Sequence, residues 1–111
     1  MYNGRQAVAR PGTGSSTRKL EQTRERAVSP ALFKVLMLND DYTTMEFVVE
    51  VLEAVFHKSP TEANRIMLSV HQRGSGLCGI YPWEIAETKV ARVHARARAA
   101  GFPLKCSIEQ A

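Results

Sequence analysis

The stretch LMLNDDYTTMEF, residues 36–47, joins two segments of different periodicity. Residues 32–38 (LFKVLML) form a short apolar run with several β-favouring side chains, which predicts a strand. From Met45 onward, apolar residues recur at spacings of three and four, which predicts a helix that reaches about His57. The junction between strand and helix carries one amide and two carboxylate side chains, side by side.

The polar residues of this junction have two possible uses. Thr43 followed by Glu46 matches a capping box, so Thr43 is predicted as the N-cap of the helix. Asn39, Asp40 and Asp41 would then close the turn. A turn accounts for one or two such residues better than for three, because Thr43 already supplies the cap. The pattern alone leaves two hypotheses open, a tight turn or a binding site for a positively charged group.

The remaining elements have clear boundary signals. They are a second helix from a capping box at 59–62 to Gly74, a strand at 77–81, a third helix from Pro82 to Gly101, and a strand at 104–108. The resulting order is β-α-α-β-α-β. This order predicts an α/β (α+β) sandwich, in which a small three-stranded antiparallel sheet packs against three helices.

Charge and composition divide the chain in two. Residues 1–28 are rich in Gly, Ser, Thr, Arg and Gln, which predicts a disordered basic N-terminal extension. They hold six basic and two acidic side chains and so carry the whole formal net charge of +4. Residues 29–111, predicted as one domain, are neutral and offer no excess charge for nucleic acid. Within them, residues 29–64 carry two basic and six acidic groups, which suits a cation.

Several classes of protein are disfavoured. No apolar stretch approaches the roughly 18 residues of a membrane span, and the N-terminus lacks the apolar core of a signal peptide, so we expect a cytoplasmic protein with no membrane contact. Cys78 and Cys106 stand in short apolar stretches without metal-ligand spacing, so we expect two buried thiols and neither metal nor cofactor.

His71 is the residue that could complete a binding site with the polar residues of the junction. Met67, Val70 and His71 share one face of the second helix. A two-residue link makes the second helix pack antiparallel to the first, which places its late residues near the junction. A single histidine on such a face is more often a core residue, so its role depends on the turn acceptors reaching it. His57 and His94 are predicted to be solvated.

The combined chemistry of these residues suits one kind of ligand. Carboxylates, an amide oxygen and a neutral imidazole are all acceptors for an ammonium group, and an apolar wall suits a hydrophobic side chain. A free peptide N-terminus with a bulky first residue offers both. Two alternatives stay open: a small hydrolase or metal enzyme that uses Asp41 and His71, and a nucleic-acid or membrane binder that acts through the basic arm. The first lacks a recognisable nucleophile motif.

Four segments resemble the ClpS family: LNDDYTTMEFVVEVLEAVF, RIMLSVHQRGSGLCGIY, EIAETKVARVHARA and FPLKCSIE. The resemblance extends from about Pro30 to the C-terminus. It implies a non-enzymatic adaptor, without catalytic residues, that captures N-degron (N-end rule) substrates beginning with Leu, Phe, Tyr or Trp. It also implies delivery of these substrates to the N-terminal domain of ClpA, the AAA+ unfoldase of the ClpAP protease. We expect the adaptor to be a monomer.

The resemblance also assigns residues. It places Asn39, Asp41 and His71 on the substrate α-ammonium group, with Asp40 at the same rim. The side-chain pocket would be lined by Met37, Thr43, Met45, Val48, Met67, Val70 and Leu104. Met45 resembles the family's gatekeeper, which excludes β-branched Val and Ile by its bulk.

Two further features follow from the same resemblance. Glu84 and Lys89 in the third helix match positions that dock on ClpA, and the N-terminal extension matches a segment needed for substrate handover. Thr44 stands where the family often has Pro, and we expect little effect on the pocket.

Overall fold

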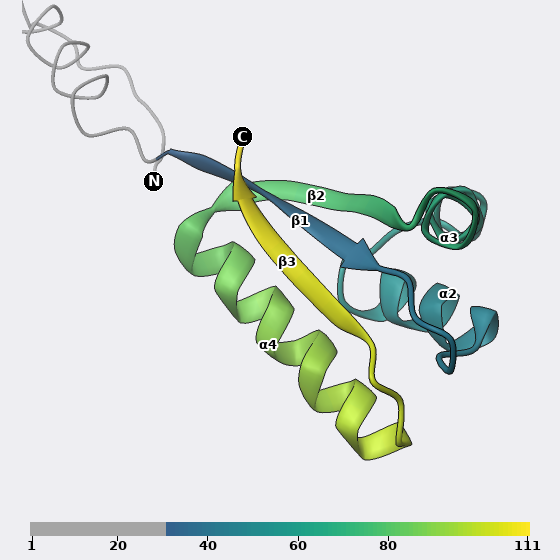
Figure 1. Cartoon of the computed structure of the whole chain (residues 1–111). Helices are drawn as coiled ribbons and strands as arrows, with labels where there is room; N and C mark the ends of the chain where they lie inside the picture. Colours follow the sequence, from purple (N-terminus) through teal and green to yellow (C-terminus); the bar gives the residue numbers. More distant parts are fainter. Residues whose placement is uncertain (1–30) are drawn as a thin grey trace, which may run out of the picture.

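The structure, a computed structural model, describes residues 31–111, and the predicted extension at 1–28 lies outside them. The described elements follow in the predicted β-α-α-β-α-β order (Figure 1). They are β1 (Leu32–Leu38), α2 (Met45–Ala54), α3 (Pro60–Arg73), β2 (Ser75–Pro82), α4 (Trp83–Ala100) and β3 (Lys105–Gln110). Among these residues no helix combines the length and the apolar character needed to cross a membrane.

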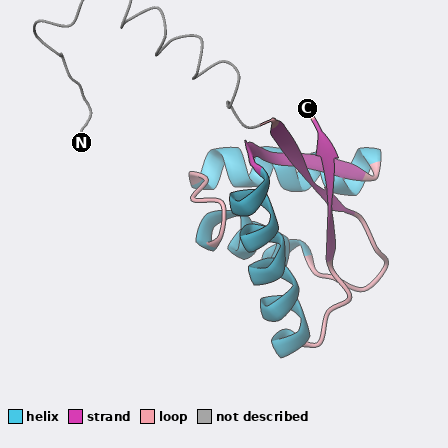
Figure 2. Cartoon of the chain, turned by 90° about the vertical axis from the view of Figure 1, so that its left-hand side faces the viewer, coloured by secondary structure: helices cyan, strands magenta, loops and turns pink. Residues whose placement is uncertain are grey.

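The sheet has the strand order β2-β1-β3, and both pairings are antiparallel, which confirms the predicted α+β class. Met37 at the centre of the sheet pairs with Gly76 on one side and Cys106 on the other. The register of β1 with β2 shifts between Val35 and Leu36. The helices gather on one side of the sheet, and α3 runs across the end where β1 stops (Figures 1 and 2).

The core lies between the sheet and its helices. Alternate residues of β1, Val35 and Met37, are fully buried, as the period of two in a strand requires. Cys78 and Cys106 lie in the same core as free thiols, which confirms their predicted burial. α2 contributes Val48, Val51 and Leu52, α3 contributes Ala63, Ile66, Met67 and Val70, and α4 contributes Ala86, Val93 and Ala97.

The boundaries of α3 follow the sequence signals. The Ser59 hydroxyl accepts a hydrogen bond from the Glu62 N–H at 3.2 Å, and Pro60 occupies the first turn. Gly74 ends the helix with a φ of 91°, a left-handed conformation that glycine adopts without steric cost. Gly76 then permits close approach to α3, because a Cβ there would lie 2.8 Å from a Val70 methyl carbon and 3.0 Å from the Ile66 carbonyl oxygen.

Two sequence-based predictions about the fold were wrong, the end of α2 and the solvation of His94. α2 ends at Ala54 rather than near His57, because the Lys58 N–H donates to the Leu52 carbonyl and the chain reverses through His57, whose φ is 57°. The expected solvation of His94 was also wrong. Its Nε2 accepts a hydrogen bond from the Cys106 N–H at 3.1 Å, because α4 packs directly beside β3.

The environment of His94 explains its protonation state. Burial lowers the pKa of the imidazole, and the positive charges of Lys105 and Arg98 lower it further. The neutral ring can therefore act as the acceptor that the Cys106 N–H requires.

The bounds of two strands differ slightly from the sequence-based prediction. The strand predicted at 104–108 forms at 105–110, and the strand predicted at 77–81 extends over 75–82.

Candidate functional site

The turn after β1 is tied to the end of α3. The Asn39 N–H donates a hydrogen bond to the Gly74 carbonyl at 3.0 Å. This bond holds the last turn of α3, which contains His71, beside the polar junction. The C-terminal end of a helix carries a partial negative charge, so the end of α3 adds to the acidic character of the turn.

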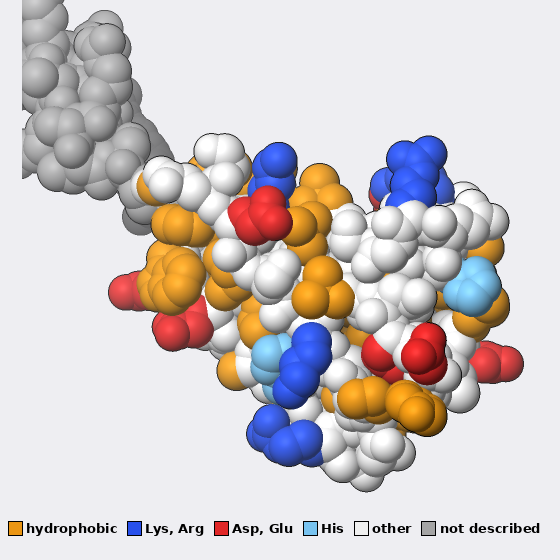
Figure 3. All heavy atoms as spheres, viewed as in Figure 1, with side chains coloured by type: hydrophobic (Ala, Val, Ile, Leu, Met, Phe, Trp, Pro, Cys, Tyr) orange, Lys and Arg blue, Asp and Glu red, His pale blue; other side chains and the backbone are white. Residues whose placement is uncertain are grey.

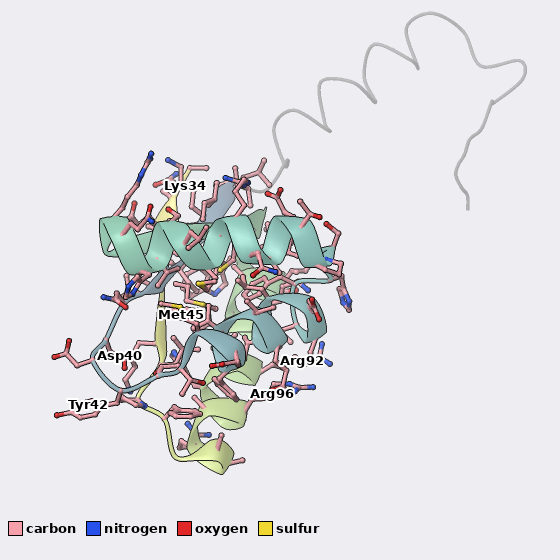
Figure 4. The ribbon with its side chains drawn as sticks, turned by 90° about the vertical axis from the view of Figure 1, so that its right-hand side faces the viewer. Lys34, Asp40, Tyr42, Met45, Arg92 and Arg96 are labelled. Atoms are coloured by element: carbon pink, nitrogen blue, oxygen red, sulfur yellow. The ribbon has the colours of Figure 1, made fainter. Side chains whose placement is uncertain are left out.

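Asp40 organises the turn. Its Oδ1 accepts hydrogen bonds from the Tyr42 N–H at 2.8 Å and the Thr43 N–H at 2.7 Å, and its Oδ2 accepts the Thr43 hydroxyl at 2.7 Å. Burial acts to raise the pKa of this carboxyl group, but the three hydrogen bonds outweigh it and hold the pKa below its ordinary value. Figure 4 shows Asp40 and Tyr42 on this turn, which leads into α2 and Met45.

The hydrogen bonds of Thr43 correct the predicted helix cap. Because its hydroxyl donates to Asp40, the N-cap is Thr44, whose Oγ1 accepts from the Phe47 N–H at 3.1 Å. α2 therefore begins one residue later than the capping box at Thr43 predicted. Two adjacent threonines offer the same hydroxyl chemistry, and the position of the Asp40 carboxylate selects between them.

A cavity of about 360 Å³ lies between this turn, the start of α2 and the last turns of α3. Its polar wall is formed by Asn39, Asp40, Asp41, Thr43, Thr44 and His71, and its apolar wall by Met45, Val48, Met67 and Val70. In Figure 3, acidic side chains and one histidine lie on the right-hand side of the molecule, where Figure 1 places the end of β1 and α3, while other acidic side chains lie elsewhere on this face. The cavity thus joins hydrogen-bond acceptors to an apolar surface.

The cavity collects most of the residues predicted from sequence. Nine of the eleven predicted binding residues line it, from both helices and the turn. Met37 and Leu104 do not, because they are 0% and 2% exposed and belong to the core. Thr44 lines the cavity although it was not predicted to do so. Its place between two predicted pocket residues, Thr43 and Met45, was the signal that could have identified it.

The acceptors differ in how they are engaged. Among residues 31–111, no hydrogen bond or ion pair engages the Asp41 carboxylate or the His71 imidazole, and both residues are exposed. Asp40, by contrast, uses both carboxylate oxygens for hydrogen bonds within the turn.

The part of the chain that the structure describes contains no cluster of three or more His, Cys, Asp or Glu residues that could hold a metal ion.

The two residues predicted to dock on ClpA lie on α4. Glu84 is exposed in its first turn. The Lys89 ammonium group donates to the Val55 carbonyl at 2.9 Å and lies 5.8 Å and 5.3 Å from the ring centroids of Phe56 and Tyr81. Burial lowers the pKa of Lys89, and the charge of Arg92 adds to the effect.

Comparison with known proteins identifies the family. Residues 28–107 match a family model described as "ATP-dependent Clp protease adaptor protein ClpS". The ClpS protein of Nitratidesulfovibrio vulgaris is 55% identical over 100 residues, covering 90% of this chain and 98% of the relative. That of Desulfatibacillum aliphaticivorans is 59% identical over 90 residues, covering 81% and 86%.

A solved structure agrees with these sequences. Agrobacterium tumefaciens ClpS2 bound to L-phenylalaninamide superposes with a TM-score of 0.72 at 43% identity, covering 74% of this chain and 99% of the other. Proteins of this family act as adaptors and not as enzymes. The chain described here belongs to the ClpS family of ATP-dependent Clp protease adaptors.

Proposed function

We propose that this adaptor binds N-degron substrates through their free α-amino group and their bulky first residue, Leu, Phe, Tyr or Trp. The observation that carries the proposal is that Asn39, Asp41 and His71 line the same cavity as an apolar wall. An ammonium group offers three donors, and these three side chains offer acceptors. We place this adaptor in the cytoplasm, with residues 29–111 as its binding domain and 1–28 as an extension.

The unequal engagement of the acceptors supports a division of roles. Asp41 and His71 have no partner among the described residues, so they can accept from a ligand without breaking the fold. Asp40 holds the turn in shape at the rim of the cavity. The ligand of the related A. tumefaciens ClpS2, L-phenylalaninamide, carries the same pair of groups, an amino group and a large apolar side chain.

The apolar wall supports the choice of first residue. Thr43, Met45, Val48, Met67 and Val70 line the cavity and would surround the side chain, whereas Met37 and Leu104 would support that wall from the core. Burying a Leu or Phe side chain contributes roughly 1.5–3 kcal/mol. Each charge-assisted hydrogen bond adds roughly 1.5–3 kcal/mol, so two or three of them together with the buried side chain contribute roughly 4.5–12 kcal/mol before the cost of association.

Delivery of the captured substrate to the N-terminal domain of ClpA completes the proposed function. Glu84, exposed at the start of α4, is available for such docking. Lys89 would dock through the part of its side chain that stays accessible, because its ammonium group already donates to the Val55 carbonyl.

The test uses a ten-residue peptide that begins with Phe, in a free and an N-acetylated form, titrated against the full chain by fluorescence anisotropy. The free peptide should bind, and acetylation should abolish binding, because it removes the charge and leaves the acceptors unpaired. His71→Ala should weaken binding at least several-fold. His57→Asn is the matched control, because His57 is exposed and does not line the cavity, and Asn tolerates its positive φ. Equal binding of the two peptides would overturn the proposal.

A further inference from the structure

A second cavity adjoins the first. It has a volume of about 320 Å³ and lies between α2 and α3, lined by Met45, Glu46, Val49, Asn64 and Met67. We call it the outer cavity. It shares Met45 and Met67 with the proposed substrate pocket, so these two side chains form the partition between the two spaces.

The two halves of the partition differ in freedom. Met67 is 8% exposed and packs within the core, whereas Met45 is 43% exposed. A methionine side chain has three rotatable bonds and adapts to irregular spaces. Figure 4 shows Met45 in the space between α2 and α3. Because open space lies on both sides of Met45, this side chain is the part of the partition that can move.

The far wall of the outer cavity is rigid by comparison. Val49 stands four residues after Met45 on the same face of α2, and its β-branched side chain has few rotamers. Asn64 is held on α3 by a hydrogen bond from its Nδ2 to the Pro60 carbonyl at 2.8 Å. A displaced Met45 side chain would therefore be stopped by Val49 and Asn64.

From this geometry we propose that the outer cavity receives the Met45 side chain when a large aromatic first residue enters the substrate pocket. Val49 and Asn64 then set the upper size limit of the first residue, although neither lines that pocket. In this proposal a leucine leaves Met45 in its present position, whereas an indole, the largest of the four first side chains, pushes it into the outer cavity. The inference rests on the proposed function. It gives Val49 and Asn64 a role in selecting the first residue, although neither lines the substrate pocket.

The experiment measures two free peptides that differ only in a first residue of Leu or Trp, against four forms of the full chain. Val49→Phe fills the outer cavity and should lower Trp affinity by about threefold to tenfold relative to Leu, because Met45 must then adopt a strained rotamer. Val49→Ala enlarges the cavity and should shift the ratio toward Trp. Glu50→Phe adds the same ring to an exposed position of α2 outside both cavities and should leave the ratio unchanged.

The outcomes separate this inference from the proposed function. If the wild-type chain binds neither peptide, the proposed function fails, and this inference fails with it. If the wild type binds both but Val49→Phe and Val49→Ala leave the Trp-to-Leu ratio unchanged, the inference alone is overturned. Circular dichroism establishes that each variant is folded, and Val49→Ala decides the matter if Val49→Phe is not.

Discussion

Replacing Asp40 by alanine tests whether this carboxylate shapes the turn or contacts the ligand. The substitution removes the acceptor of three hydrogen bonds of 2.7–2.8 Å, two from backbone N–H groups and one from the Thr43 hydroxyl. The turn is partly solvated, and water replaces some of the lost bonds. At a net contribution of roughly 0.5–1.5 kcal/mol per bond, we expect the free energy of unfolding to fall by about 1–3 kcal/mol.

Asp40→Asn is the informative companion variant. Its amide oxygen can still accept from the two backbone N–H groups, and its NH₂ group can donate to the Thr43 hydroxyl. The turn should therefore survive with most of its stability. If Asp40 acts through the turn, Asp40→Asn should bind a Phe-start peptide nearly as well as the wild type, and Asp40→Ala should bind several-fold more weakly. Direct contact with the ammonium would make both variants weak.

The dependence of stability on pH gives an independent check. The pKa of Asp40 in the folded state lies below its ordinary value of 3.8, so its contribution is present above the pKa of the unfolded chain. That contribution is lost as the pH falls through the folded-state pKa. The difference in unfolding free energy between wild type and Asp40→Asn should therefore shrink between about pH 5 and pH 2.

Urea denaturation followed by circular dichroism measures the stabilities, and fluorescence anisotropy measures peptide affinity. Glu53→Ala, on the far part of α2 and outside the cavity, controls for removal of an acidic side chain. An Asp40→Ala variant that unfolds at the wild-type urea concentration would refute the account of Asp40 as the organiser of the turn.

Two further variants probe contacts between elements of the fold. Lys89→Met keeps most of the packing on Phe56 and Tyr81 but leaves the Val55 carbonyl without its donor. It should lower the free energy of unfolding by roughly 0.5–1.5 kcal/mol in a urea titration, while Arg92→Met, an exposed control on α4, should stay close to wild type. Gly76→Ala places a methyl group against Val70 and the Ile66 backbone, so we expect a loss of about 1–3 kcal/mol in the same titration. A midpoint unchanged by Gly76→Ala would show that β2 can move away from α3 at no cost.

Local patterns were sufficient for most of the secondary structure. The strand at Leu32–Leu38 formed over the predicted residues, because a short apolar run with β-favouring side chains has few alternatives. α3 began at the Ser59-Pro60 signal and ended at Gly74, because capping and left-handed conformation depend on the residue and its immediate neighbours. The end of α2 was misjudged, since a hydrogen bond from Lys58 and a reversal at His57 stop that helix without a glycine or proline.

For the site, the sequence determined the chemistry but not the assembly. The residue types at 39–41 already supplied acceptors, and helical spacing placed His71 beside Met67 and Val70, while the resemblance to ClpS supplied the wider set of pocket residues. The bond from the Asn39 N–H to the Gly74 carbonyl, which brings these two parts together, joins residues 35 positions apart and has no local signature.

The remaining details were decided by the tertiary structure alone. Whether Thr43 or Thr44 caps α2 depends on the Asp40 carboxylate, and whether Met37 meets the cavity or the core depends on how α2 and α4 cover the sheet. His94 and Lys89 look solvated in a helical pattern, yet each bonds to a backbone group of another element. The physical reason is the same for His94 and Lys89. Hydrophobic periodicity specifies which side of an element is buried, whereas a hydrogen bond between distant segments depends on where two such sides meet.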